Sequence, residues 1–180
     1  MKDKTLKIIA LISLILIIAM MAMIFAFSNQ TGNKSGELSG RVTEFVINTF
    51  YKNYESLSSS EQAALKGNIE HFIRKAAHFT LFMVLGIVLL IHVFSIFELK
   101  KKRSIYSIPI VSVLGILYAF SDEFHQFFKE GRGPQFKDVL IDSLGVLTGV
   151  LISYMLLTVI KLCIIKKNSK GNIEDGKRED

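Results

Sequence analysis

The stretch IIALISLILIIAMMAMIFAF, residues 8–27, decides the class of this protein, because it contains no charged side chain and Ser13 is its only polar one. A helix rises about 1.5 Å per residue, so this run is about 30 Å long, the thickness of a bilayer's hydrocarbon core. We predict a membrane-spanning helix over about residues 6–27, with Lys7 at its start. A signal peptide also begins with basic residues, but its apolar run is usually about 7–15 residues, so we expect this helix to be retained.

Three further apolar segments have similar lengths, at residues 76–97, 105–121 and 139–160. The first of these contains no ionisable group except two histidines, and the last contains only Asp142. We expect His92 to have a packing role, because it has no polar partner at a matching depth. The mean hydropathy of +0.39 agrees with a membrane protein. The sequence thus predicts an all-α polytopic protein with four transmembrane helices in a single membrane domain, residues 1–167.

Basic residues predict the orientation of these helices. They gather beside the spans in three places, at residues 2–7, 100–103 and 161–167. Short loops rich in Lys and Arg stay in the cytoplasm, so we expect both termini there, with residues 28–75 and 122–138 on the outer side. These clusters also account for the net charge of +6, so we expect no nucleic-acid partner.

The long outer connector contains helical patterns of its own. Apolar residues recur at helical spacing in its first half, which predicts an amphipathic helix on the membrane surface or against the bundle; they are Leu38, Val42, Phe45, Val46 and Thr49. Ser58 and Glu61 have the spacing of a capping box, so a second helix should begin there and run towards the next span. At the other end of the chain, the charged tail 168–180 lacks aromatic residues, and we expect it to be disordered.

The predicted topology brings polar residues from three segments to the outer face. They are Arg74, Lys75 and His78 before the second span; Asp122, Glu123, His125 and Gln126 after the third; and Arg132, Asp138 and Asp142 before or within the fourth. Asp122, His125 and Gln126 share one face of a helix. The two aspartates of the last group share a stripe with Gly145 and Gly149, whose spacing lets a neighbouring helix approach closely. We therefore expect a charged pocket inside the bundle.

Each group also has a structural interpretation, which the sequence leaves open. Arg74 and Lys75 either anchor a helix end or bind an anion, and His78 either packs or takes part in a site. The group after the third span either holds helices together by hydrogen bonds or performs chemistry. Asp138 also has the position of an N-cap, and Arg132 either lies in a flexible turn or clamps a phosphate.

The residue types indicate acid–base chemistry on an anionic ligand. Asp122 and His125 offer a carboxylate and an imidazole on one helical face, with Glu123 beside them as a further acid or base. Arg74 and Arg132 would contact a phosphate. A metal site is an alternative, because five of these residues have side chains that bind metals: His78, Asp122, His125, Asp138 and Asp142. Helical bundles that bind two metals, however, use two carboxylate–histidine pairs, and this chain has one such pair, so we predict no metal and no cofactor. The single cysteine, Cys163, excludes an internal disulfide.

Taken together, these motifs resemble the VanZ-like family over roughly residues 28–151. The resemblance rests on Arg74-Lys75-x-x-His78, Asp122-Glu123-x-His125-Gln126, Gly131-Arg132, Asp138 and the glycine-containing span, with Phe27-Ser28-Asn29-Gln30 after the first span. It implies a small multi-pass protein of the bacterial cytoplasmic membrane that is associated with resistance to teicoplanin-type glycopeptides. The resemblance implies this phenotype without implying a reaction.

Three functions follow as hypotheses. The first is that the outer pocket recognises, and modifies or simply binds, an anionic envelope lipid such as a polyprenyl-phosphate-linked precursor, or a glycopeptide-related ligand. The second is a binding or shielding protein without turnover. The third is a proton-coupled transporter, which the absence of charges through the middle of the membrane disfavours. Besides the ligand, we expect membrane lipids as partners.

Overall fold

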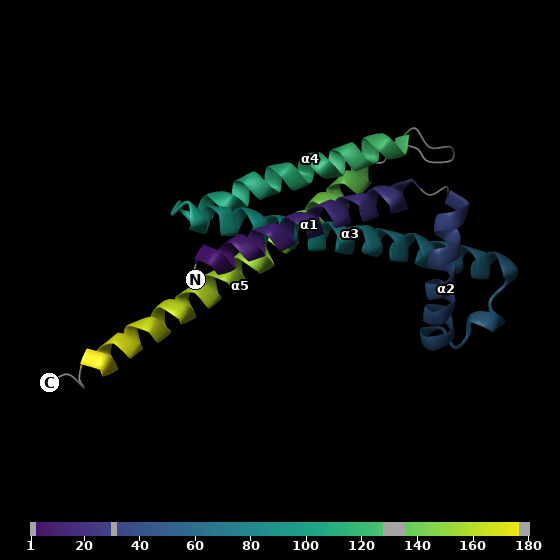
Figure 1. Ribbon diagram of the computed structural model, residues 1–180. Helices are drawn as coiled ribbons and strands as arrows, with labels where there is room; N and C mark the ends of the chain where they lie inside the picture. The colour runs from purple at the N-terminus through teal and green to yellow at the C-terminus, as the bar shows by residue number, and fades with distance from the viewer. Residues whose placement is uncertain (1–2, 30–31, 128–135, 177–180) are drawn as a thin grey trace.

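The computed structural model describes residues 3–29, 32–127 and 136–176, and all of its regular elements are helices (Figure 1). They are α1 (Asp3–Ser28), α2 (Gly32–Phe50), the short 3-10 helix η1 (Tyr54–Ser56), α3 (Ser59–Leu99), the short 3-10 helix η2 (Ser104–Tyr106), α4 (Ser107–Phe127) and α5 (Phe136–Gly176). Four of them, α1, α3, α4 and α5, are long and apolar enough to cross a membrane, which confirms the four predicted spans.

The four long helices run alternately up and down. The first helix begins, and the last one ends, at the same end of the bundle as the α3–α4 connection (Figure 1). At that end, Lys161 of α5 forms an ion pair of 2.6 Å with Glu98 of α3. At the opposite end lie the start of α5 and the ends of α1 and α4.

Two helices extend beyond the bilayer. With 41 residues, α3 is about 60 Å long, twice the hydrocarbon thickness. It begins at the predicted capping box: Ser58 accepts a hydrogen bond from the backbone of Glu61, and the Glu61 carboxylate accepts one from the backbone of Ser58. The other long helix, α5, continues to Gly176, so it includes much of the segment from 168 onward that the sequence predicts to be disordered. Residues 177–180 lie outside the described part.

The predicted amphipathic helix is α2, which lies across the first part of α3 (Figure 1). From residue 39 onward, where the structure describes its side chains, the buried ones are Ser39, Thr43 and Ile47, which follow one another one turn apart. Most of the apolar stripe that defined the helix in the sequence is not its packing face, since Val42 is 48% exposed and Phe45 is 68% exposed. This leaves α2 an apolar surface of the kind that lies on a membrane.

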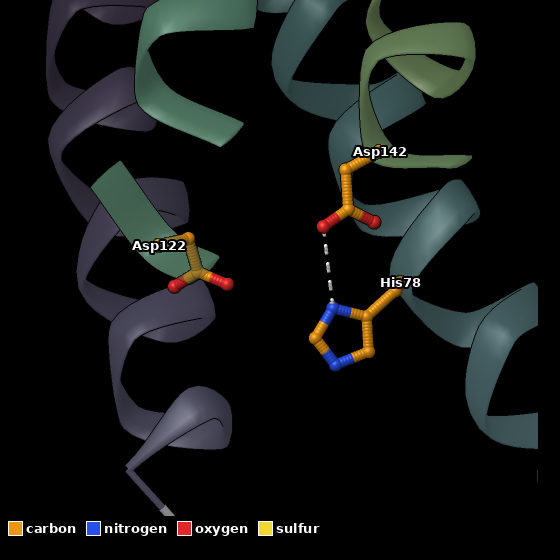
Figure 2. A group of neighbouring side chains, drawn as sticks. All are labelled: His78, Asp122 and Asp142. Atoms are coloured by element: carbon orange, nitrogen blue, oxygen red, sulfur yellow. Dashed lines mark ion pairs between the residues drawn. The ribbon is translucent and has the colours of Figure 1, made fainter. Parts of the chain in front are cut away.

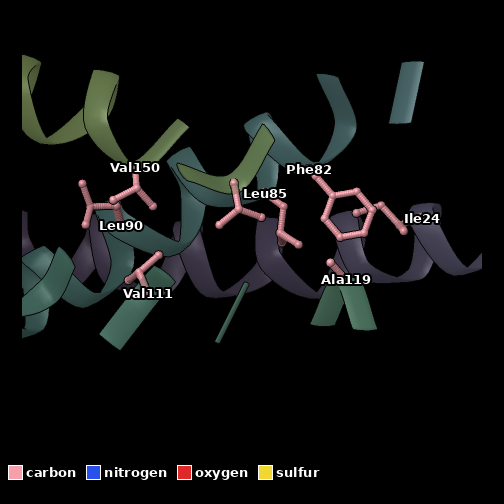
Figure 3. Packing of buried hydrophobic residues seen from close by; sticks show 8 residues of the cluster. Ile24, Phe82, Leu85, Leu90, Val111, Ala119 and Val150 are labelled. Atoms are coloured by element: carbon pink, nitrogen blue, oxygen red, sulfur yellow. The ribbon is translucent and has the colours of Figure 1, made fainter. Parts of the chain in front are cut away.

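Close helix packing forms the core (Figure 3). Its fully buried members come from all four spans and include Ile24, Phe82, Val111 and Val146. The glycine stripe of α5 lies directly on α3: a Cβ at Gly145 would overlap the carbonyl oxygen of Phe79, and one at Gly149 would overlap that of Met83. The apolar side chains that remain exposed, such as Leu11, Ile18 and Met155, are available to contact lipid.

One polar contact lies inside the apolar region. The Nδ1 atom of His92 lies 3.1 Å from the hydroxyl of Ser13 and 3.0 Å from the carbonyl oxygen of Ala10. The expectation that His92 has no polar partner was therefore wrong. Because α1 and α3 are antiparallel, a residue near the start of one meets a residue near the end of the other.

Candidate functional site

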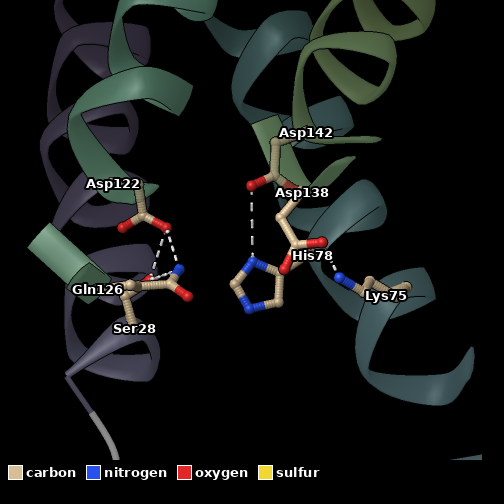
Figure 4. A network of polar contacts seen from close by, with 7 residues as sticks. All are labelled: Ser28, Lys75, His78, Asp122, Gln126, Asp138 and Asp142. Carbon is tan, nitrogen blue, oxygen red and sulfur yellow. Dashed lines mark hydrogen bonds and ion pairs between the residues drawn. The ribbon is translucent and has the colours of Figure 1, made fainter. Parts of the chain in front are cut away.

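A cluster of polar side chains lies at the end of the bundle opposite the two termini (Figure 4). Every long helix contributes to it, because α1 and α4 end there, α5 begins there and α3 passes through. We call it the polar cluster; its members are Ser28, Lys75, His78, Asp122, Gln126, Asp138 and Asp142. Five of these seven were predicted as ligand-binding residues, and Asp122 was predicted as catalytic.

The carboxylate of Asp122 is held by two hydrogen bonds. Ser28 donates to Oδ2 at 2.7 Å, and the Gln126 amide donates to the same oxygen at 2.9 Å. Gln126 also lies 3.3 Å from the Ser28 hydroxyl. The three side chains are almost fully buried, and Asp122 is 4% exposed. The end of α1 and the end of α4 are thus joined around one carboxylate.

A second carboxylate, Asp142, lies opposite the first. Its Oδ2 is 3.8 Å from Nδ1 of His78, an ion-pair distance that is too long for a hydrogen bond. Its Oδ1 is buried and has no hydrogen-bond partner among the described residues. One ligand atom each from His78, Asp122 and Asp142 lie within 4.8 Å of one another (Figure 2). Three helices, α3, α4 and α5, therefore meet at these side chains.

Lys75 and Asp138 form an ion pair between α3 and α5. Asp138 lies in the first turn of α5, which begins at Phe136, so it is inside the helix and is not an N-cap. A carboxylate in this position interacts favourably with the helix dipole. Lys75 also interacts electrostatically with Glu123 and Asp142. Lys75 therefore interacts with three carboxylates, and its side chain is mostly buried.

Beside the polar cluster, a cavity of about 580 Å³ opens between α1, α2 and α3. Its lining is mainly apolar and includes Phe27, Val42, Ala77 and Leu81, with Arg74 and His78 as the charged or ionisable members. The Nε atom of Arg74 is buried without a hydrogen-bond partner in the part of the chain that the structure describes. A buried guanidinium nitrogen of this kind is suited to receive an acceptor from a ligand.

One predicted residue, His125, lies apart from the polar cluster. His125 stacks on Phe25, with ring centroids 4.6 Å apart, and its Nε2 is buried without a partner among the described residues. The described contacts do not join His125 to Asp122, so the acid–base role of this pair stays a prediction, as does that of Glu123, which is 7% exposed. Arg132 lies outside the described residues.

The sequence reasoning did not select Ser28 as a site residue. It is fully buried and bonds Asp122 directly. The available signal was its position: it follows the apolar run of the first span, at the outer end where Asp122 closes the third. Ser28 is also part of the sequence pattern on which the family resemblance rests.

Comparisons with known proteins support that resemblance. Neither curated proteins nor solved structures gave a match. A family model described as VanZ/LLP1 matches residues 13–158, which include the second and third predicted spans, most of the first and fourth, and every described member of the polar cluster. The match covers most of the chain, so this protein belongs to the VanZ/LLP1 family.

Proposed function

We propose that the polar cluster and the adjoining cavity bind a polyprenyl-phosphate lipid of the bacterial envelope. The observation that carries the proposal is that His78 belongs both to the polar cluster and to the lining of the apolar cavity. One ligand with a charged head and a hydrocarbon chain would occupy both. The cavity volume, about 580 Å³, is in the usual range for a small-molecule site.

Arg74 would contact the phosphate. It lies in the cavity wall with a buried nitrogen that has no partner among the described residues, and a phosphate oxygen is a strong acceptor for it. The neighbouring Lys75 already pairs with Asp138. Of the two earlier interpretations of Arg74, this placement favours anion binding over a simple helix anchor.

Binding of an exposed envelope lipid would explain the expected protection against teicoplanin-type antibiotics. In the orientation that the basic residues predict, the polar cluster faces outward, where envelope precursors are exposed. Sequestering or modifying such a lipid would change what a glycopeptide meets at the membrane surface. An apolar cavity favours the lipid over a soluble glycopeptide as the direct ligand.

The test is binding of a radiolabelled polyprenyl diphosphate to the full chain in nanodiscs. Arg74→Gln removes the phosphate contact, and Ala77→Trp fills the cavity without changing a polar residue. Arg41→Gln and Ala64→Trp are the matched controls, because both positions are exposed and neither lines this cavity. We expect about tenfold weaker binding in the first two variants, and wild-type binding in the controls.

Two results would contradict the proposal. One is equal lipid binding by all five proteins. The other is saturable binding of teicoplanin itself with no binding of the lipid. Extraction of the lipid after incubation separates the remaining hypotheses, because a new product indicates an enzyme and unchanged lipid indicates a binding or shielding protein.

A further inference from the structure

Asp122 and Asp142 place two carboxylates in a buried space where acidic side chains outnumber the basic ones described near them. Asp122 is 4% exposed and Asp142 is 2% exposed. Buried charges are normally paired or bind a metal, because leaving water is costly. Lys75 forms its ion pair with Asp138 and is shared electrostatically with Asp142 and Glu123, so it does not neutralise both buried aspartates. Within the described residues, His78 is the basic side chain that lies between the two aspartates.

The spacing of these groups fits ligands of one ion better than a hydrogen bond. Nδ1 of His78 and Oδ2 of Asp142 are 3.8 Å apart, whereas a hydrogen bond needs about 3.2 Å or less. Ligands at about 2.0–2.2 Å from a shared metal lie about 3–4 Å from one another. The three ligand atoms lie within 4.8 Å of each other. A side-chain movement of about 1 Å would bring all three to metal-ligand distance from one ion.

Two further features indicate a ligand at this point. Oδ1 of Asp142 is buried, has no hydrogen-bond partner among the described residues, and belongs to a carboxylate that faces His78 (Figure 2). On the opposite side, both hydrogen bonds to Asp122, from Ser28 and Gln126, go to Oδ2. Such bonds orient a metal-binding carboxylate in known sites. The arrangement is therefore more than a group of acidic side chains.

We infer that His78, Asp122 and Asp142 bind a divalent transition-metal cation, of the Zn²⁺ or Mn²⁺ type. One imidazole and two carboxylates suit such an ion, whereas Mg²⁺ and Ca²⁺ prefer oxygen ligands alone. The sequence offered these three among five candidate metal ligands but led to a prediction of no metal, because it contains a single carboxylate–histidine pair on one helix. The structure selects these three from the candidates, because α3, α4 and α5 bring their ligand atoms together.

Three protein ligands leave coordination positions open. If the proposed function holds, a phosphate oxygen of the lipid takes one of them, and the ion overcomes the repulsion that two carboxylates exert on an anion. The binding of the ion itself does not depend on that function. The two proposals are therefore tested by separate measurements.

The experiment measures Zn²⁺ and Mn²⁺ on the purified full chain in detergent, without lipid, after loading and dialysis. All proteins carry Cys163→Ser, because the exposed thiol of Cys163 is a competing zinc ligand, and none carries a histidine tag. His78→Gln and Asp142→Asn remove ligands. His92→Gln is the matched control, since it changes the same residue type on the same helix. Elemental analysis gives the ion content, and circular dichroism shows that each variant is helical.

We expect one ion of Zn²⁺ or Mn²⁺ per chain in the parent protein and in His92→Gln, and loss of the ion in His78→Gln and in Asp142→Asn. A parent protein that retains neither ion would overturn the inference, and its two carboxylates would then be neutralised by protons. Full retention in His78→Gln would overturn it as well, even if Asp142→Asn failed to fold. Lipid binding measured with and without EDTA then shows separately whether the ion serves the proposed function.

Discussion

The hydroxyl of Ser28 shows how one small side chain connects distant parts of this protein. It donates to a buried carboxylate on α4, at 2.7 Å, from the last residue of α1. Interhelical hydrogen bonds within membranes contribute about 0.6 kcal/mol on average and up to about 1.7. A bond to a charged acceptor belongs to the upper part of that range. Ser28 should therefore be more important for stability than its size suggests.

Replacing Ser28 by alanine should lower the free energy of unfolding by about 1–2 kcal/mol, because Asp122 loses a donor in a buried site. Ser95→Ala is the control, since Ser95 is equally buried but bonds only the carbonyl of Ile91 in its own helix. Unfolding of both variants in mixed micelles gives the comparison. An equal decrease in the free energy of unfolding for the two variants would show that the hydrogen bond to Asp122 adds no stability beyond that of a bond within one helix.

The sequence could identify polar residues near the outer ends of the spans, but it could not pair them. Asp122, His125 and Gln126 lie on one helical stretch, and the structure confirms a bond only between Asp122 and Gln126. The ring of His125 stacks on Phe25 of another helix instead. Side-chain partners across helices depend on helix rotation and tilt, which local spacing does not specify. The contacts of His92 with Ser13 and Ala10 could not be predicted for the same reason.

At the scale of elements, the contact between α3 and α5 positions the site. The glycine stripe of α5 lets the backbones approach, and the same helical face carries Asp138 and Asp142 towards α3. This part was predictable, because the two aspartates and the two glycines follow one stripe in the sequence. The packing face of α2 was less predictable, because its buried side chains include Ser39 and Thr43, which are polar and do not belong to an apolar pattern.

Gly149→Ala should destabilise the protein by about 1–3 kcal/mol, because the added methyl group meets the backbone of α3 at Met83, which cannot move aside. Gly67→Ala is the matched control in a helix. It has no neighbouring atom within 4 Å of the added carbon. We expect a gain of about 0.5–1 kcal/mol there from helix propensity. Thermal unfolding in detergent measures both, and a neutral Gly149→Ala would contradict the close contact.

On the scale of the whole molecule, charge and hydropathy determine most of the architecture. The spans follow from runs such as residues 8–27, because a helix satisfies every backbone polar group within one such segment while its apolar side chains face lipid. The alternation of the helices then places both termini at one end and the polar cluster at the other (Figure 1). Which end faces the cytoplasm stays a prediction from the basic residues.

That orientation predicts a labelling pattern for single cysteines in a Cys163→Ser background. Lys52→Cys should react with a membrane-impermeant maleimide in intact cells, because the connector before α3 is expected outside. Lys166→Cys should react only in inverted vesicles. Both positions are exposed, so access to the reagent depends on the side of the membrane. The reverse pattern would place the polar cluster in the cytoplasm and remove the proposed access to envelope lipids.

The most direct test of the account compares two histidines of α3 in living bacteria. Cells that express the wild type, His78→Gln or His92→Gln at matched membrane levels are tested for susceptibility to teicoplanin, with vancomycin and an empty vector alongside. The account predicts that the wild type and His92→Gln protect against teicoplanin, and that His78→Gln does not, because His78 joins the polar cluster to the cavity. Equal protection by all three proteins would contradict a functional role for the polar cluster.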